Sequence, residues 1–343
     1  MSPVEISSHA AGGAWDAYVE AHPDGTPDHL WGWQEVFADV FGHQCTYLTA
    51  QRAGTISGVL PLVRFNSRLF GRFLVSLPFL NYGGLLTSDE ESASRLVEAA
   101  RVIAAEFGAS HIELRHRSRQ RGDLPCRQHK VGMLLRLPET ADLLWKQIDR
   151  KIRNQVRKAQ KEQLSADSDG ASLADDFYAV FARNMRDLGT PVYSRKLFAA
   201  TLRVFPGRTR IHVVRRAGQP VAVGFTVRFR DTILVPWASS LREFRHLSPN
   251  VLLYWNMIET AVADGARVFD FGRSSRGGGT YQFKQQWGAA EIPLHWEYVM
   301  LSGSEPPDQG PANPRFSLAI EAWKRLPLWL ANAAGPMIVR NVP

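Results

Sequence analysis

Hydrophobic and polar residues follow the same pattern in two distant segments of the chain. Residues 47–65 read YLTAQRAGTISGVLPLVRF, and residues 211–229 read IHVVRRAGQPVAVGFTVRF. Aligned without a gap, the two segments share Arg-Ala-Gly near the middle and Arg-Phe at the end. Each consists of two runs rich in Val, Ile and Leu that an Ala-Gly turn connects, and this predicts a β-hairpin in both places.

A second shared pattern follows each hairpin. Residues 93–106 and 251–263 have helical patterning, and a Gly-Ala pair follows each of them, at 108–109 and 265–266. An alternating strand then runs to residue 115 in the first half and to residue 272 in the second. Because hairpin, helix and strand recur in one order, we infer an internal duplication that gives two mixed α/β lobes. A ligand is expected in the cleft between two such lobes.

The chain is long enough for two domains, because one hydrophobic core rarely extends over 343 residues. We divide it into an N-terminal domain (1–145), a basic connecting helix (146–165), a C-terminal domain (166–302) and a tail (303–343) packed back on a lobe. Apolar residues make up 45% of the chain, which is typical of folded proteins. The sequence has neither the pattern of a signal peptide nor an apolar run of membrane-spanning length, so we expect a cytoplasmic protein.

Positive charge is concentrated in the connecting helix. The chain carries 41 Lys and Arg against 33 Asp and Glu, a net charge of +8, which favours an anionic partner such as a phosphate, tRNA or a membrane surface. In a single helix over 143–163, the cations fall within an arc of about 80°. They are Lys146, Arg150, Arg153, Arg157 and Lys161. A solvated surface explains such a run equally well, but an anionic partner would relieve the repulsion between the cations.

The segment 268–299 contains the strongest candidate for chemistry. A strand at 268–271 runs into GRSSRGGG (272–279), and a short helix is expected at 281–287. Consecutive glycines let backbone amides approach a phosphate or a carbonyl oxygen, although glycines are also common in mobile surface loops. We assign Lys284 as the catalytic residue, because a partly desolvated cation stabilises an oxyanion by about 3 kcal/mol. Substrate contacts are expected from Arg273, Ser274, Gly279, Thr280 and Phe283, and from Arg153 of the basic helix.

Two further segments are weaker candidates for substrate contact. Asn81 and Tyr82 precede two glycines in a turn, where polar side chains could point into a cleft. Trp237, Ser239 and Arg242 lie at or just beyond the end of a strand whose small residues leave room for a substrate. Ordinary strand termination explains both patterns equally well.

Several kinds of chemistry have no support in the sequence. The ten histidines lack metal-binding spacing, so we expect no metal. Cys45 and Cys126 form no CxxC pair, and we interpret both as reduced packing residues. No serine lies in a GxSxG elbow, so the nucleophile is expected to be the amine of a substrate.

Six segments together resemble the FemAB family of peptidyltransferases, and most closely its branch associated with exosortase and PEP-CTERM exopolysaccharide systems. They are LPFLNYGGLL (77–86), KIRNQVRKA (151–159), RDLGTPVYS (186–194), SPNVLLYW (248–255), FDFGRSSRGGGTYQFKQQWG (269–288) and WKRLPLWLAN (323–332). The resemblance extends over nearly the whole chain. It implies an α/β (α+β) fold of two tandem GNAT-like (acyl-CoA N-acyltransferase-like) domains with a C-terminal helix.

The resemblance also implies an activity, the transfer of an amino acid from aminoacyl-tRNA to an amine on a cell-envelope or exopolysaccharide precursor. Phe283-Lys284 is similar to the Phe-Lys pair of the family, whose lysine is implicated in catalysis. No bound cofactor is implied. Acetyltransferases of this fold bind coenzyme A through an Arg/Gln-x-x-Gly-x-Gly/Ala loop, which residues 274–279 and 68–73 each match except at one position. Aminoacyl-tRNA is therefore the favoured donor, and acyl-CoA the other candidate.

Two other functions stay open at this point. One is an acyl-CoA-dependent N-acetyltransferase, and the other is a non-catalytic module that binds nucleic acid or a glycan in an exopolysaccharide system. The tail adds a question of location, because residues 316–340 mix Trp and Leu with Lys and Arg, as interfacial helices do. Pro327 interrupts this helix and favours packing on a lobe, with peripheral contact to the inner face of a membrane as the alternative.

Overall fold

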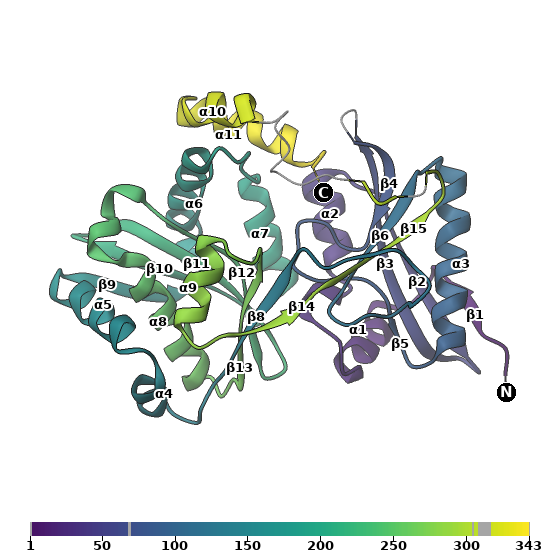
Figure 1. Cartoon of the computed structure of the whole chain (residues 1–343), viewed down its shortest axis with the longest axis horizontal. Helices are drawn as coiled ribbons and strands as arrows, with labels where there is room; N and C mark the ends of the chain where they lie inside the picture. Colours follow the sequence, from purple (N-terminus) through teal and green to yellow (C-terminus); the bar gives the residue numbers. More distant parts are fainter. Residues whose placement is uncertain (1, 68–69, 304, 308–316, 343) are drawn as a thin grey trace. The chain divides into compact units, whose positions relative to one another are not determined.

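The computed structural model describes residues 2–67, 70–303, 305–307 and 317–342, which belong to two compact units (Figure 1). Unit 1 comprises Met1–Val131, Pro293–Gly310 and Arg340–Pro343, and unit 2 comprises Gly132–Ile292 and Pro311–Val339. Each unit has one sheet with helices packed against it, which confirms the expected α/β architecture.

Unit 1 is an eight-stranded sheet in the order β1-β2-β3-β4-β6-β15-β7, with β5 paired to β3. One hydrophobic core cluster lies between the sheet and the long helix α3, which buries an alanine-rich face against the strands. The elements are β1 (Glu5–Ser7), α1 (Gly12–Ala21), η1 (Pro27–His29), α2 (Trp33–Phe41), β2 (Cys45–Arg52), β3 (Thr55–Ser67), β4 (Gly71–Val75), β5 (Leu86–Thr87), α3 (Glu90–Phe107), β6 (His111–His116), β7 (Cys126–Arg127) and β15 (His295–Met300).

Unit 2 is a seven-stranded sheet in the order β14-β8-β13-β12-β11-β10-β9. Helices α6 and α7 cover one of its faces, and α5 and α8 cover the other (Figure 1). The elements are β8 (Val131–Arg136), α4 (Ala141–Gln147), α5 (Arg150–Lys161), β9 (Leu164–Asp169), η2 (Ala171–Leu173), α6 (Ala174–Leu188), α7 (Arg195–Val204), β10 (Thr209–Arg216), β11 (Gln219–Phe229), β12 (Thr232–Ser240), η3 (Arg242–Leu247), α8 (Pro249–Ala263), β13 (Val268–Ser274), α9 (Gly279–Gln286), β14 (Ala290–Pro293), α10 (Ser317–Lys324) and α11 (Leu328–Val339).

The two predicted hairpins are β2–β3 and β10–β11, and they share local geometry as well as sequence. Ala53 and Gly54 have φ values of 47° and 78°, and Ala217 and Gly218 have φ values of 48° and 82°. Two successive positive φ angles identify the tight turn that matches the twist of the flanking strands. The pairing register also shifts at the same position of both hairpins, after Ala50 and after Val214.

The helix and strand that follow each hairpin also agree between the units. The N–H of Ala109 donates to Ala104 O (2.8 Å) at the end of α3, and that of Ala266 donates to Ala261 O (2.9 Å) at the end of α8. In both places a left-handed glycine makes this helix ending possible. The next strand then pairs in parallel, β6 with β4 and β13 with β12. The two units are therefore copies of one supersecondary unit.

The predicted domain boundaries differ from the sheets in two places. Strand β15, which the prediction placed in the C-terminal domain (166–302), pairs antiparallel with β6 and belongs to unit 1. Strand β8, which the prediction placed in the N-terminal domain (1–145), belongs to the sheet of unit 2. The partner of β15 is about 180 residues away in sequence, and an alternating pattern shows that a segment is a strand but not which sheet accepts it.

The single basic helix expected at 146–165 is also corrected. The chain leaves the helical conformation at Ile148, whose ψ is 152°, and helix α5 begins after Asp149. The Asp149 carboxylate accepts a hydrogen bond from Lys151 N, as an N-cap residue does. Arg153 donates to Trp145 O and Lys146 O (both 3.1 Å), so its guanidinium caps the last turn of α4.

The tail (303–343) contributes α10 and α11, which pack against α6, while residues 304, 308–316 and 343 lie outside the described residues. Pro327 separates the two helices, as the sequence indicates. Arg186 donates to Leu326 O at this break (2.9 Å), and Gly335 approaches Val192 so closely that a Cβ would clash with its backbone. Helices α10 and α11 of the tail are thus part of the fold of unit 2.

Candidate active site

Strands β12 and β13 of unit 2 separate toward their carboxyl ends. They pair at Thr232–Val268, Ile233–Phe269 and Leu234–Asp270, and no pairing is recorded beyond these three in the described part of the chain. Both strands continue for several residues, to Ser240 and Ser274. Parallel strands that part in this way open a crevice at their carboxyl ends, the usual ligand position in α/β sheets.

Lys284 lies on α9, the short helix that follows β13. Its side chain points back to the strand, where Nζ donates to Gly272 O (3.1 Å) and Arg273 O (3.0 Å). The residue is only 7% exposed. Burial lowers the pKa of Lys284 to about 8, the negative charge of Asp270 opposes this shift, and the nearby Arg273 adds to it. The sequence-based choice of Lys284 thus falls on a buried amine held at the carboxyl end of the open strand.

Aromatic packing fixes α9 against the sheet. The Tyr254 ring of α8 stacks on Phe271 (centroids 5.5 Å apart) and contacts Phe283 edge to face (5.0 Å). Trp287 is 1% exposed and lies beside the same rings. Phe283 therefore anchors the helix that carries Lys284. Tyr254 was not predicted, because a tyrosine on a helix that is apolar on most positions has no distinguishing sequence signal.

The glycine-rich segment between β13 and α9 presents backbone amides. Gly277 has a left-handed φ of 75°, a conformation that favours glycine. At Gly279 the space is open, because a Cβ there would meet no atom within 4 Å. The first turn of α9 has neither a side-chain cap nor an acidic residue, so its amides and its positive dipole end are available to an anion. Thr280 is exposed at this end. Gly279 and Thr280 thus border open space, as a substrate contact requires.

Two polar atoms near Lys284 in the chain are buried and lack a hydrogen-bond partner among the described residues. They are Ser274 Oγ at the end of β13 and Trp287 Nε1 just after α9. Buried polar atoms are nearly always hydrogen-bonded, and exceptions are frequent where a ligand or water completes the site. Arg273 lies half-buried next to them and raises the local positive potential. The residues predicted from 273–284 therefore come together in one place.

The other predicted residues of unit 2 have different surroundings. Trp237 is in the core, edge to face with Phe198 (5.2 Å) and Phe225 (5.3 Å), so it packs the sheet against α7. Ser239 Oγ accepts a hydrogen bond from Asn184 Nδ2 (3.0 Å). Arg242 is exposed at the start of η3. For Trp237 the structure favours the ordinary packing role over substrate contact.

Asn81 and Tyr82 belong to unit 1, in the loop between β4 and β5. Their backbone amides donate to Asp28 Oδ2 (3.0 and 2.8 Å), a carboxylate that is 1% exposed. The same loop holds Leu77 and Phe79 at positive φ (55° and 68°), a strained conformation that is characteristic of functional loops. Asp28 was not predicted, because its partner loop is about 50 residues away in sequence.

Each unit has a buried acidic residue at the equivalent position of the repeat, and this pair was not predicted. Glu113 of β6 pairs with Val75, and Asp270 of β13 pairs with Leu234, each as the last parallel pair of its unit. Both carboxylates are buried. Glu113 accepts hydrogen bonds from Arg115 Nε (2.7 Å) and Tyr298 Oη (2.9 Å). The alignment of FGASHIELR with DGARVFDFG already superposes Glu113 on Asp270 and is the signal that could have found the pair.

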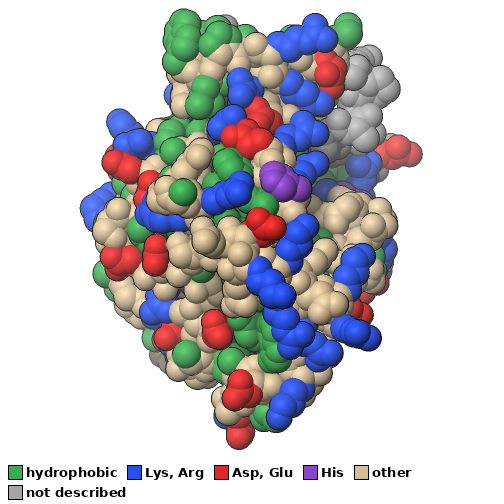
Figure 2. Space-filling model, turned by 90° about the vertical axis from the view of Figure 1, so that its left-hand side faces the viewer, with side chains coloured by type: hydrophobic (Ala, Val, Ile, Leu, Met, Phe, Trp, Pro, Cys, Tyr) green, Lys and Arg blue, Asp and Glu red, His purple; other side chains and the backbone are tan. Residues whose placement is uncertain are grey.

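Exposed cations form a basic surface on unit 2, defined here by seven residues of α5 and η3. Lys158 Nζ donates to His246 O (2.8 Å), which fastens the two elements together. Within the described ranges none of the seven forms an ion pair with a carboxylate. Figure 2 shows a run of Lys and Arg side chains on the face that carries α5. The seven are Arg150, Lys151, Arg157, Lys158, Lys161, Arg242 and Arg245.

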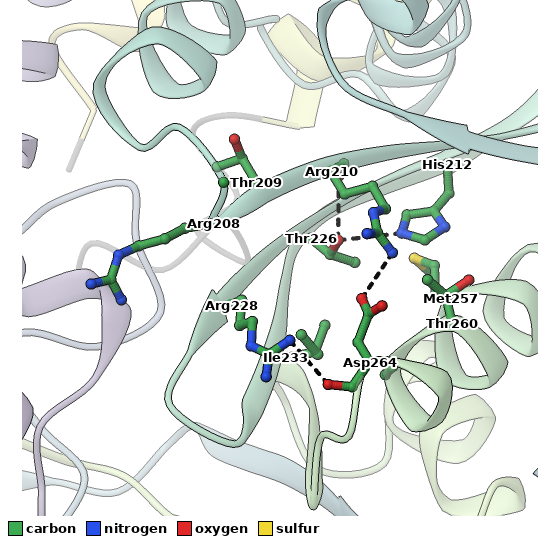
Figure 3. Close-up of a pocket in the computed structure, with 12 residues that line it drawn as sticks. Arg208, Thr209, Arg210, His212, Thr226, Arg228, Ile233, Met257, Thr260 and Asp264 are labelled. Atoms are coloured by element: carbon green, nitrogen blue, oxygen red, sulfur yellow. Dashed lines mark hydrogen bonds and ion pairs between the residues drawn. The ribbon is translucent and has the colours of Figure 1, made fainter. Parts of the chain in front are cut away.

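A cavity of about 210 Å³ lies at the C-terminal end of α8 (Figure 3). Arg208, Arg210 and Arg228 are among the residues that line it. Arg210 pairs with Asp264 (2.8 Å), and Arg228 donates to the backbone oxygen of Asp264 (3.1 Å). Two of the three cations thus hold the C-terminal turn of α8, and the cavity is separate from the Lys284 site.

Neither cysteine has the environment of a nucleophile. Burial raises the pKa of Cys45 to about 12, and burial also raises the pKa of Cys126. Over the residues that the structure describes, His, Cys, Asp and Glu form no group of three that could hold a metal ion. No helix in the described ranges is both long and apolar enough to span a membrane.

Comparison with known proteins identifies the fold of this site. Residues 146–285 match the family model of the acetyltransferase (GNAT) domain. This match lies within unit 2 and supports the expected acyltransferase activity. A search of curated proteins found no match.

Several solved structures share the tandem arrangement at low sequence identity. FemX is 15% identical, with a TM-score of 0.67 over 92% of this chain and 100% of that chain. A tandem GNAT protein from the clavulanic acid biosynthesis pathway is 12% identical, with a TM-score of 0.54 over 88% and 100%. L-PGS from Bacillus licheniformis is 10% identical, with a TM-score of 0.54 over 94% and 98%. The predicted fold of two tandem GNAT-like domains is thereby confirmed.

Proposed function

We propose that the protein is an N-acyltransferase that moves an aminoacyl group from aminoacyl-tRNA to an amine on a cell-envelope or exopolysaccharide precursor. One observation carries the proposal, the buried Lys284 amine that two backbone carbonyls hold at the carboxyl end of β13. The uncapped first turn of α9, the helix that carries Lys284, adds backbone amides. A fixed cation next to backbone amides in a desolvated crevice is the arrangement that stabilises an oxyanion.

The reaction needs no nucleophile from the protein. The neutral acceptor amine attacks the ester carbonyl of the donor, and the carbonyl oxygen becomes an oxyanion that Lys284 and the first amides of α9 stabilise. The new C–N bond remains, the C–O bond to the ribose breaks, and the proton lost by the amine ends on the released hydroxyl. The part of this chain is to orient both substrates and to place positive charge where negative charge develops.

The basic surface supports tRNA as the donor. Its seven exposed cations have no carboxylate partner in the described ranges, so they repel one another until an anion binds. A polyanion such as tRNA would neutralise several of them at once and release its counterions. Two of the predicted substrate residues lie in this region. Arg153 caps α4 and is not one of the seven residues, whereas Arg242 belongs to the basic surface.

The starts of α3 and α8, the two helices that follow the hairpins, argue against binding of coenzyme A at these two helices. A pyrophosphate binds best to free amides at a glycine-rich helix N-terminus. The helix that follows the hairpin strands begins with Pro249 in unit 2, which removes an amide, and with Asp89, Glu90 and Glu91 in unit 1, which would repel the phosphates. The related glycine pattern 274–279 lies before α9 instead, and Arg68 of the pattern 68–73 is outside the described residues.

An acyl-CoA-dependent N-acetyltransferase is the second candidate, and the match of residues 146–285 to an acetyltransferase domain favours it. Binding isotherms at several salt concentrations separate the two. The tRNA proposal predicts an affinity for tRNA that falls steeply with salt, with a slope that reflects several phosphate contacts, and weak binding of coenzyme A. Tight binding of coenzyme A alone would move the proposal to the second candidate.

Mass spectrometry of the acceptor fraction tests the transfer itself. The purified protein would be incubated with charged tRNA and with extracted envelope precursors, and a product heavier by one aminoacyl residue is expected. Binding of tRNA without such a product would identify a non-catalytic module. The acceptor in an exopolysaccharide system rests on the FemAB-like segments, and comparison of precursors from strains with and without the gene tests it.

A further inference from the structure

Helix α11 has an unusual composition for a helix at the surface. Its twelve residues, LWLANAAGPMIV, contain no charged side chain, and Asn332 is the one polar member. A helix that is apolar on all sides is normally buried on all sides. Here only one side is buried, through Ala331, Gly335 and Val339, which are spaced four residues apart.

The opposite side of α11 faces solvent and is equally apolar. Trp329, Ala333 and Met337 follow one another at the same four-residue spacing, and Trp329 and Met337 are each 72% exposed. Leu318 of the neighbouring α10 is 84% exposed. These four residues are the outer stripe. Figure 2 shows hydrophobic side chains at the top of the molecule, where Figure 1 places α10 and α11.

Burying large hydrophobic side chains is the main favourable term in protein folding, so this exposure calls for a partner. Most other hydrophobic side chains of the described chain lie in the two cores, and only Val102, Leu143 and Leu188 are exposed by 45% or more outside the last two helices. The outer stripe is therefore the main concentration of exposed apolar surface on unit 2.

Cations flank the apolar helix in sequence. Lys324 and Arg325 precede α11, and Arg340 follows its last residue. Glu321 is the one acidic residue among the described residues 317–342, and Lys324 pairs with it. Exposed Trp with flanking Lys and Arg is the composition of helices that lie in a membrane interface, and twelve residues are too few to cross the bilayer.

From this arrangement we infer that α11 binds the surface of an anionic lipid membrane, with the outer stripe among the acyl chains and the flanking cations at the headgroups. The charge pattern selects lipid over a second copy of the chain, because two such surfaces would bring cations against cations. The fold of unit 2 holds the inner side of the helix, so binding requires no unfolding. The proposal is independent of the reaction at Lys284.

Sedimentation of the full chain with lipid vesicles tests the inference without any substrate. Vesicles of phosphatidylglycerol and phosphatidylcholine are expected to carry the protein into the pellet, and vesicles of phosphatidylcholine alone much less of it. The double variant Trp329→Gln and Leu318→Gln should weaken binding about tenfold or more, because two large side chains no longer enter the lipid. Arg325→Gln should weaken it about fivefold.

A matched control separates the outer stripe from exposed hydrophobicity in general. The double variant Val102→Gln and Leu143→Gln removes two side chains of 50% and 45% exposure and should bind the vesicles like the wild type. Equal loss in both variants, or no binding to anionic vesicles, would overturn the inference. Concentration-dependent self-association that Trp329→Gln abolishes, without binding to vesicles, would also overturn it and would assign the stripe to a second copy.

Discussion

The Lys284 side chain occupies a position where burial opposes its charge, and two backbone carbonyls hold it there nonetheless. Burial lowers the pKa of Lys284 to about 8, while Gly272 O and Arg273 O accept hydrogen bonds from Nζ. An amine with these partners is poised to donate to a third acceptor when it is charged. The residue thus meets the two requirements of an oxyanion donor, fixed geometry and low solvent exposure.

Replacing Lys284 with Met is expected to lower turnover about a hundredfold, because one preorganised donor to the oxyanion is lost. Stability should change by only about 1–2 kcal/mol, since the variant loses two hydrogen bonds but no longer buries an amine. Steady-state kinetics and thermal unfolding check the two quantities separately. Unchanged turnover in a folded variant would remove Lys284 from the mechanism.

The pH dependence of turnover shows whether Lys284 acts as a charged donor to the oxyanion or as a general base. The ammonium is lost as the pH rises through about 8, so the ratio of wild-type to Lys284→Met turnover should fall toward one from pH 7 to pH 10. The ratio cancels the titration of the acceptor amine. Between pH 8 and 10.5 the unfolded chain binds more protons, so the wild type should also gain stability relative to the variant. A ratio that rises with pH would identify Lys284 as a general base instead.

Gly279 offers a test of the loop that does not disturb the fold. A Cβ there meets no atom within 4 Å, so Gly279→Val should leave the free energy of unfolding within about 1 kcal/mol of the wild type. If substrate approaches this backbone, turnover should fall by tenfold or more, on the order of a lost transition-state contact. Gly13→Val, at a helix position with equally open surroundings, is the control. Full activity of the Gly279 variant would show that substrate does not pass over the loop.

At the residue scale, chemistry-bearing side chains close together in sequence could be predicted, and those that depend on distant segments could not. Arg273, Ser274 and Lys284 lie within a dozen residues, and Lys284 Nζ donates to Arg273 O. That they bind substrate stays a prediction. Asp28 holds a loop from another part of unit 1, and nothing near it in the sequence indicates this role. Trp237 was assigned to substrate because the small residues beside it at the end of its strand leave room for a ligand, but its ring packs in the core.

Among the elements, α5 carries the argument for an anionic donor. Removing one of its exposed cations that contacts a phosphate should lower the slope of log affinity against log salt by about one. Arg150→Gln and Lys161→Gln, both exposed on α5, are the variants of choice, and Lys196→Gln, exposed on α7, is the control. Fluorescence titrations with tRNA at four salt concentrations provide the slopes. Identical slopes in all proteins would contradict a role of α5 in binding tRNA.

Local patterns were sufficient for the repeated elements and insufficient for the basic helix. The hairpins β2–β3 and β10–β11 were predictable because alternation and an Ala-Gly turn are encoded within about 20 residues. The break at Ile148 was missed because periodicity continues across it. Asp149 is an N-cap residue by type, and it could have indicated that a new helix begins there.

For the molecule as a whole, the main structural claim is that β15 completes the sheet of unit 1. Val299 of β15 is 1% exposed in the core of that unit. A charge there, as in Val299→Asp, should cost about 3 kcal/mol or more. Hydrogen exchange should then show faster exchange in β4 and β6 of unit 1, with β11 and β12 of unit 2 much less affected. Faster exchange only in unit 2 would mean that β15 belongs to the C-terminal domain, as the sequence-based boundaries had it.

The duplication was visible in the sequence, but the membership of its sheets was not. Pairing between β6 and β15 joins residues about 180 positions apart, and neither strand has a pattern that distinguishes this partner from others. Strand β8 likewise enters the sheet of unit 2 from the end of the N-terminal segment. The predicted boundaries at 145/146 and 302/303 therefore assign β8 and β15 to the wrong units.

Transfer of a labelled amino acid from charged tRNA to a panel of amine acceptors is the sharpest test of the proposed activity. The assay would follow the label by mass spectrometry with the wild type and with Lys284→Met, using acyl-CoA donors in parallel. We expect a labelled amide with the wild type, about a hundredfold slower formation with the variant, and no product from acyl-CoA. Product from acyl-CoA alone, or equal rates for the two proteins, would contradict it.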